Sequence, residues 1–184
     1  MRDVFTRRRG WPWLTAALAW ALAGCSVPVP VYSVAGKNVA ALRSAPRPVR
    51  VGQFTGDQQT VSCRLRPIGP EGGGTFAAYI QNAFEEEATI TGRRPAEGEV
   101  ELRGVLRRVD VDCGIVEASW TIEMDMSIGE QPPFTVKTVR RFDGNYLGGV
   151  VFQRAYTAFV PSVQEFVHDV LASPAFQAAV AATR

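Results

Sequence analysis

The chain has 184 residues, of which 46% are hydrophobic and 21% are charged, so it is long enough for one domain with a real core. The charged fraction is too high for a polytopic membrane protein. The excess of positive charge lies in the first nine residues, so the rest of the chain gives no reason to expect nucleic-acid binding.

The N-terminal segment has the order of a secretory signal. Basic residues come first, and an apolar run from Trp11 to Ala23 follows them. This run is too short for a stable membrane span. Removing residues 1–24 takes four arginines and Asp3 from the 20 basic and 18 acidic residues, leaving 16 and 17, so the mature chain is close to neutral.

The signal ends at Leu22-Ala23-Gly24-Cys25, where a branched residue and two small ones precede a cysteine. This pattern resembles the lipobox of bacterial lipoprotein precursors. It suits the chemistry, because the Cys25 thiol takes a diacylglyceryl group and a peptidase needs small residues ahead of its cleavage site. We expect the mature protein to begin at Cys25, anchored by acyl chains of the palmitate type. The alternatives are an ordinary signal peptide with a chance cysteine and a cytosolic N-terminal helix.

The segment after the cysteine looks different from the rest of the chain. Residues 25–48 are rich in proline and lack periodicity, which predicts an extended tether. A single domain over residues 49–184 is expected to follow. Its first strand is predicted to begin at Val49 and to continue after a turn as far as Leu65.

One helix is predicted next. Thr75 is placed to cap it, apolar residues recur at helical spacing from Phe76 to Phe84, and Gly92 is placed to end it. The triple glycine before Thr75 lacks the lysine and hydroxyl pair of a phosphate-binding loop, so we do not expect one there.

Three strands are predicted after this helix. The apolar phase changes within the first of them, which indicates an irregularity near Gly104. The second has strict alternation of apolar and polar residues, typical of a strand with one solvated face. The three span about residues 100–112, 116–128 and 134–142.

The last third of the chain is predicted to be helical from about Thr157. Pro161 and the capping-box spacing of Ser162 and Glu165 place the start within a turn of the proline. Ser173-Pro174 is expected to restart a short final helix. The order strand, helix, three strands, helix predicts an α+β fold with an antiparallel sheet of about four strands and helices packed on one face.

The cysteine count favours one disulfide. If Cys25 takes the lipid, Cys63 and Cys113 remain as a pair, and in an oxidising periplasm such a pair is more often bonded than free. A redox pair and two buried thiols are the alternatives. The long separation argues against a redox role, because it lacks the Cys-x-x-Cys spacing that tunes a thiol pKa.

The lipobox, the tether and this element order together resemble small Gram-negative envelope lipoproteins. These include the lipopolysaccharide-assembly lipoprotein, the auxiliary lipoproteins of lipid-transport ABC systems, and uncharacterised families. The resemblance implies an accessory role. Because Ser26 follows Cys25 where an inner-membrane retention signal has aspartate, it also implies sorting to the outer membrane, facing the periplasm. It carries no functional residues over to the domain.

Enzymatic chemistry is not expected. His168 is the single histidine and has no second metal ligand four residues away on either side. Asp110 and Asp112 share one face of a strand, which suits a solvated surface better than a calcium or glycosidase pair. We therefore expect no catalytic residue, no metal and no cofactor.

Two kinds of binding function remain, and we expect docking onto an envelope protein partner. The apolar stretch from Tyr146 to Phe152 is predicted to be either an adaptable binding loop or a buried strand. Arg140 and Arg141 lie on an expected sheet edge, where they would either discourage strand addition or pair with acidic lipid or a partner. The alternative is a carrier of a lipid or small hydrophobic molecule, with a pocket lined by Trp120, Met124 and Met126. A carrier should contain an apolar cavity, whereas a docking module should have a filled core and an apolar outer patch.

Overall fold

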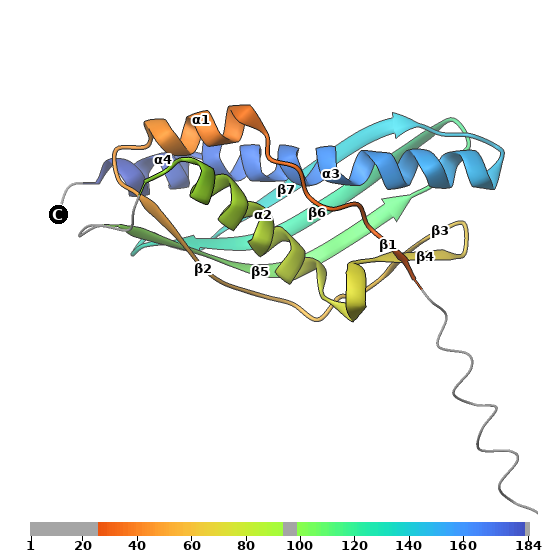
Figure 1. Cartoon of the computed structure of the whole chain (residues 1–184), viewed down its shortest axis with the longest axis horizontal. Helices are drawn as coiled ribbons and strands as arrows, with labels where there is room; N and C mark the ends of the chain where they lie inside the picture. The colour runs from red at the N-terminus through yellow and green to blue at the C-terminus, as the bar shows by residue number, and fades with distance from the viewer. Residues whose placement is uncertain (1–25, 94–98, 183–184) are drawn as a thin grey trace, which may run out of the picture.

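The computed structural model of the chain describes residues 26–93 and 99–182 (Figure 1). The expected signal peptide and Cys25 lie outside the described residues. The main sheet has the order β2-β5-β6-β7. Its strands are β2 (Val49–Thr55), β5 (Val100–Asp112), β6 (Glu117–Ile128) and β7 (Phe134–Asp143).

The predicted α+β class is confirmed, but the expectation of a wholly antiparallel sheet is wrong. β5, β6 and β7 are antiparallel, whereas β2 runs parallel to β5. The reason is the long connection from β2 to β5, which contains a helix and returns the chain to the starting end of the sheet. A short hairpin would have reversed the direction.

Helices cover one face of the sheet (Figure 1). The two that contact the sheet most extensively are α2 (Phe76–Ile90) and α3 (Gly148–Ala172). The short helix α4 (Pro174–Ala181) also contacts β6, and α1 (Gly36–Ser44) packs on α2 and α3. The other face of the sheet carries no helix among the described residues.

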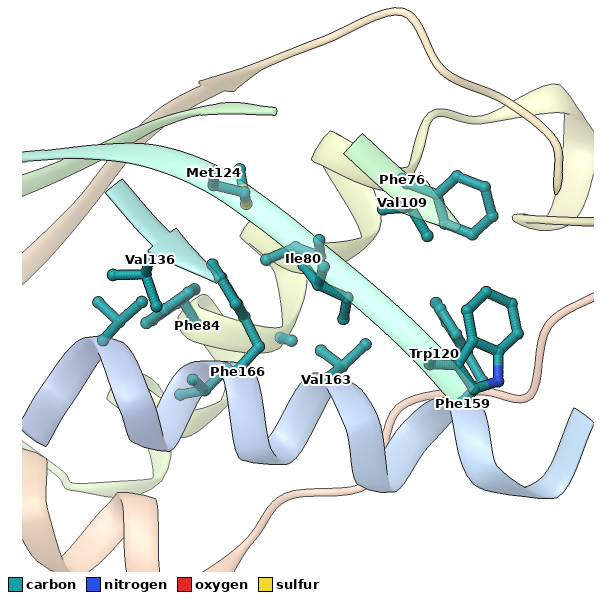
Figure 2. Packing of buried hydrophobic residues seen from close by; sticks show 14 of the residues in the cluster. Phe76, Ile80, Phe84, Val109, Trp120, Met124, Val136, Phe159, Val163 and Phe166 are labelled. Atoms are coloured by element: carbon teal, nitrogen blue, oxygen red, sulfur yellow. The ribbon is translucent and has the colours of Figure 1, made fainter. Parts of the chain in front are cut away.

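The core lies between the sheet and α2 and α3 (Figure 2). The apolar phase of β6 is fully buried, as its alternation predicted. The ring of Trp120 lies 4.8 Å from that of Phe159 on α3, and Phe84 on α2 meets Phe166 edge to face at 6.5 Å. One shared cluster therefore joins both helices to the sheet.

The expected tether over residues 25–48 is wrong for the part that the structure describes. Val27–Pro28 forms the strand β1, and α1 follows it. Val29, Tyr32 and Leu42 are buried in the core cluster. The prolines suggested an extended chain, but a few well-spaced apolar residues are enough to fold this segment onto the domain.

A buried carboxylate holds the same segment in place. The Oε1 atom of Glu87 on α2 accepts hydrogen bonds from the Tyr32 hydroxyl, from the Ala35 backbone N–H at 3.1 Å and from the Asn38 side chain at 3.1 Å. The Asn38 amide also donates to the Gln164 carbonyl at 3.0 Å, which joins α1 to α3. Glu87 and Asn38 are both fully buried, so this network ties the start of the domain to its two main helices.

The first strand does not continue to Leu65 as predicted. It ends at Thr55, and residues 61–69 form a separate hairpin of β3 (Val61–Cys63) and β4 (Arg66–Gly69). Arg64 and Leu65 make the turn with positive φ angles of 49° and 67°. β1 pairs with β4, which gives a small sheet of order β1-β4-β3, and a short 3-10 turn at Glu71–Gly73 follows.

Three local predictions for the middle of the chain are confirmed. Thr75 caps α2 by accepting from the Ala78 N–H at 3.1 Å, and Gly92 adopts a positive φ of 69° just beyond the helix. The register of β2 against β5 shifts beside Gly104, between the pairs Val51–Leu102 and Phe54–Gly104, and that of β5 against β6 shifts between Leu106 and Arg108. A side chain at Gly104 would not fit, because a Cβ there would lie 2.9 Å from the Phe54 ring.

The last long helix begins nine residues before Thr157. α3 starts at Gly148 and contains Pro161 in its interior. Ser162 is no cap, since its hydroxyl donates to the Ala158 carbonyl within the helix at 2.7 Å. A proline in a helix interior costs about 3 kcal/mol, which the continuous buried face of α3 offsets. The restart at Ser173-Pro174 is confirmed, with Ser173 capping α4.

Candidate functional site

Six exposed apolar side chains lie at one end of the molecule, on three neighbouring connections. Leu65 is at the β3–β4 turn and is 96% exposed, and Val116, in the β5–β6 turn, is 89% exposed. Ile115 lies in the same β5–β6 turn, and the β7–α3 connection and the first turn of α3 supply the other three. We call this set the apolar end: Leu65, Ile115, Val116, Tyr146, Leu147 and Val150.

Covalent and hydrogen bonds hold the three connections together. A disulfide joins Cys63 on β3 to Cys113, with their Cα atoms 5.5 Å apart, so the predicted pair is bonded. The Arg64 Nε donates to the Cys113 carbonyl at 2.8 Å. The Gly144 N–H donates to the Val116 carbonyl at 3.0 Å, so the β7–α3 connection is fixed against the β5–β6 turn.

The predicted stretch from Tyr146 to Phe152 is neither a loop throughout nor a strand, because α3 begins within it at Gly148. Tyr146 is 74% exposed, as a binding residue requires. Phe152 is 5% exposed, so the expectation that it is presented on a surface is wrong. It belongs to the core, and the Arg66 guanidinium covers its ring at 3.9 Å.

The start of the described chain lies beside the same end. Val27 of β1 pairs with Ile68 of β4 in a parallel register, and Pro28 pairs with Gly69. Because β4 begins directly after the Leu65 turn and β1 runs parallel to it, the starting end of β1 is the end nearer that turn. Figure 1 shows β1, the β3–β4 hairpin and the start of α3 at one end of the molecule.

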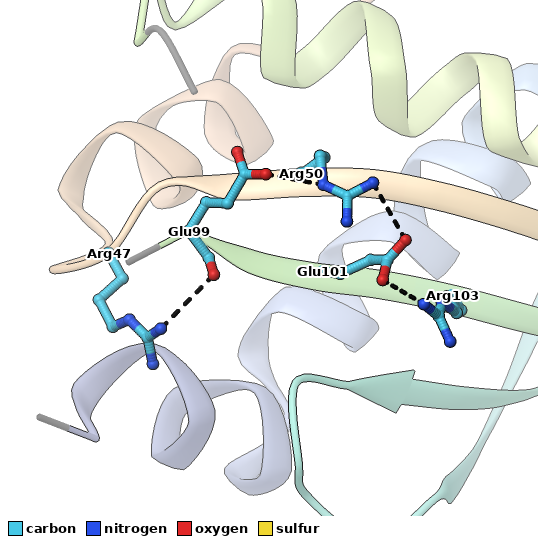
Figure 3. Close-up of polar contacts among 5 residues, drawn as sticks. All are labelled: Arg47, Arg50, Glu99, Glu101 and Arg103. Atoms are coloured by element: carbon cyan, nitrogen blue, oxygen red, sulfur yellow. Dashed lines mark hydrogen bonds and ion pairs between the residues drawn. The ribbon is translucent and has the colours of Figure 1, made fainter. Parts of the chain in front are cut away.

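A second surface is the face of the main sheet that carries no helix, which we call the open face. Paired charges cover it near β2 (Figure 3). Arg50 contacts Glu99 at 2.7 Å and Glu101 at 3.1 Å, and Glu101 also binds Arg103. The hydrogen bond from Arg103, with the charges of Arg103 and Arg50, lowers the pKa of Glu101 below its ordinary value.

The pairing continues across β6 and β7. Asp125 binds Arg107 and accepts from the Thr135 hydroxyl at 2.8 Å. These hydrogen bonds, that from Arg107 above all, hold the pKa of Asp125 below its usual value. The open face therefore presents carboxylates and guanidinium groups already fixed in position. Two apolar residues, Val105 and Val139, are exposed among them.

The two arginines predicted at the sheet edge lie on opposite faces of β7. Arg140 lies on the helix side, where its guanidinium contacts Glu165 of α3 at 2.8 Å. Arg141 lies on the open face and contacts Glu117 at 3.5 Å. Both lie on β7, which is an edge strand of the main sheet as expected, and alternation along the strand directs the two side chains to opposite faces.

The residues considered for chemistry do not gather into a site. His168 is on α3, and its buried Nδ1 has no hydrogen-bond partner among the described residues. Asp110 pairs with Arg108 on the same strand. Within residues 26–93 and 99–182, no group of three or more His, Cys, Asp or Glu side chains could hold a metal ion.

The residues expected to line a carrier pocket fill the core instead. Trp120, Met124 and Met126 are fully buried, and the Trp120 indole N–H donates to the Ala155 carbonyl at 2.8 Å. A hollow of about 330 Å³ lies on the outside between β2 and α2, and Arg50, Glu85 and Arg93 contribute to its lining. Leu42, Val49 and Val51 also line it, so the hollow is about as apolar as it is polar, and it lies outside the core that Trp120, Met124 and Met126 fill.

The chain matches no model of a known protein family and no curated protein. Among the described helices, none is both long and apolar enough to cross a membrane.

Proposed function

We propose that this protein is a lipid-anchored accessory protein of the bacterial cell envelope, without enzymatic activity, that docks onto a protein partner in an outer-membrane or transport complex. Cys25 carries the lipid, and the domain faces the periplasm. The lipobox supports the anchor, and the Cys63–Cys113 bond suits an oxidising compartment.

The observation that carries the proposal is the contrast between the interior and the outside. Trp120, Met124 and Met126 occupy the core that a carrier would need to leave open. The outside, in contrast, has an apolar end and an open sheet face without a covering helix among the described residues. Docking is therefore favoured over carriage of a hydrophobic molecule.

The open face is the better surface for a protein partner. Its charges are held in place by one another, as Arg50 is by Glu99 and Glu101, so little side-chain freedom is lost on association. Fixed charges of both signs give specificity through complementary charges on the partner. Val105 and Val139 add apolar contact within this pattern.

Crosslinking in intact cells, followed by purification through a C-terminal tag, tests this proposal. We expect one dominant envelope protein to be captured by the parent chain and by Lys37→Glu, a charge reversal on the exposed surface of α1. Arg103→Glu on the open face should lose most of that product, because it removes a positive charge and adds a third carboxylate to Glu99 and Glu101. Absence of a protein partner with crosslinkers of different reach, or equal capture by both variants, would contradict docking through this face.

A further inference from the structure

We propose that the apolar end inserts into the surface of the bilayer that holds the Cys25 lipid, so that the domain stands on the membrane in a fixed orientation. The inference rests on the lipid anchor of the proposed function. It adds a second membrane contact, made by the folded domain itself, and it leaves the open face for the protein partner.

The first step is the length of the linker between the lipidated Cys25 and the folded domain. Only Ser26 separates Cys25 from Val27, which is already part of β1. Two residue steps span at most about 7 Å. An acyl chain on Cys25 therefore draws β1 close to the membrane, whereas the 23-residue tether expected from the sequence would have left the domain free to tumble.

The second step is what lies next to β1. Val27 pairs with Ile68, which is three residues after Leu65 and so about 10 Å along the strand from it. The disulfide and the Arg64 hydrogen bond fix the Leu65 turn to the β5–β6 turn. The end of the domain nearest the lipid is therefore the apolar end.

The third step is the chemistry of this surface. Aliphatic side chains and a tyrosine, each exposed, suit the boundary between headgroups and acyl chains. Charged side chains of both signs surround them, and the arginines among them make contacts within the domain, as Arg154 does with the Asp143 and Gly144 carbonyls. The basic residues here are Arg64, Arg66, Arg141 and Arg154, and the acidic ones are Asp112, Glu117 and Asp143. With charges so nearly balanced, apolar contact rather than net charge is the driving force.

The fourth step is the rigidity of the apolar end and the orientation that it gives the domain. The three connections are already joined to one another, so insertion orders no flexible loop. The diacylglyceryl group expected on Cys25 already carries two acyl chains, which is enough for stable anchoring. Each further acyl group on the cysteine strengthens retention, but none of them orients the domain. The apolar end provides orientation.

The consequence is a sheet that stands upright. β5 runs for 13 residues toward the apolar end, a rise of about 40 Å. With that end in the membrane, the strands lie along the membrane normal. The open face is then perpendicular to the membrane plane and accessible to a neighbouring protein in the same membrane.

Tryptophan fluorescence of the full lipoprotein tests the insertion. Once the signal is cleaved ahead of Cys25, Trp120 is the one tryptophan left, and it is fully buried. We would introduce Val116→Trp at the apolar end and, as a matched control, Val105→Trp, which replaces a side chain that is 51% exposed on the open face. Each protein is purified from membranes and reconstituted into vesicles of phosphatidylethanolamine and phosphatidylglycerol that contain lipids brominated on their acyl chains.

We expect the tryptophan emission of Val116→Trp to lie to the blue of that of Val105→Trp and to be strongly quenched by the brominated lipids. The emission of Val105→Trp should be quenched no more than that of the parent. If the two variants are quenched equally, or if neither is, the insertion is overturned. The mass of the N-terminal peptide separates the two proposals. A protein without acyl mass overturns the anchor and the insertion together, whereas an acylated, vesicle-bound protein with an unquenched Val116→Trp overturns the insertion alone.

Discussion

Glu87 is a buried carboxylate that holds a segment with few apolar residues of its own. Its Oε1 accepts from Tyr32, Ala35 and Asn38, and without it the buried Tyr32 hydroxyl would lose its acceptor and Asn38 would keep only the Gln164 carbonyl. In the sequence it stands in a run of three glutamates, a pattern typical of a solvated helix face. Only helical position distinguishes Glu87, one turn after buried Ala83 and Phe84, from exposed Glu85 and Glu86.

We predict that Glu87→Ala lowers the free energy of unfolding by about 3 kcal/mol, because several buried donors lose their acceptor at once. Glu86→Ala, on the exposed side of the same helix, should change it by less than about 0.5 kcal/mol. Urea unfolding followed by circular dichroism measures both. Equal effects in the two variants would mean that the network does not hold residues 29–38.

The same site predicts how stability depends on alkaline pH. Burial and the hydrogen bond to Glu87 raise the pKa of Tyr32 above its ordinary value of 10.0, and burial raises that of Tyr79. Both phenols stay neutral in the folded protein while those of the unfolded chain ionise. Their contribution to stability is therefore complete below about pH 10 and falls as the pH rises above it.

Urea unfolding at about pH 9 and about pH 11 measures this fall. Tyr32→Phe removes one of the two phenols, so its stability should decline less steeply than that of the parent over the same interval. A variant that declines as steeply as the parent would exclude Tyr32 as a source of the dependence.

At the scale of elements, the strands with strict alternation were predictable and the segments stabilised by long-range contacts were not. β6 has one fully buried phase, so its pattern alone located it. α1 has three buried residues, two of them apolar, between proline-containing segments, and its partners lie about 50 and 125 residues away. The start of α3 was missed because Gly148, Gly149 and Pro161 are residues that usually end helices. The burial of Phe152 beneath Arg66 depends on the β3–β4 hairpin and has no local signal.

The disulfide joins the small sheet to the main sheet, because Cys63 is on β3 and Cys113 directly follows β5. It closes a separation of 50 residues, for which the chain-entropy model gives about 4 kcal/mol. We expect the double variant Cys63→Ala and Cys113→Ala to lose about this much in urea unfolding, and dithiothreitol to produce a similar loss in the parent. A loss below about 1 kcal/mol would show that the β3–β4 hairpin is held by its other contacts.

At the scale of the whole molecule, the orientation that we propose on the membrane depends on where the folded domain begins, at β1. The sequence predicted an anchor, but it could not predict that the domain starts two residues later, because β1 is a two-residue strand whose partner lies 41 residues away. A long separation in sequence likewise hides the parallel pairing of β2 with β5, in which Val49 lies beside Val100. The connection that contains α2 sets the parallel placement of β2, whereas β1 meets β4 through the connection that contains α1, β2 and β3, and no local pattern shows either one.

The anchor itself is tested by exchanging the signal. We predict that replacing residues 1–25 with an ordinary secretory signal leaves an exported domain in the soluble periplasmic fraction, while the parent fractionates with membranes and incorporates an alkyne-labelled fatty acid. Cys25→Ala in the full chain should incorporate none. The exchanged protein should also give much less of the crosslinked partner, because confinement at a membrane raises effective concentration without any new contact. Undiminished crosslinking from the soluble domain would mean that the open face binds its partner tightly enough to need no anchor.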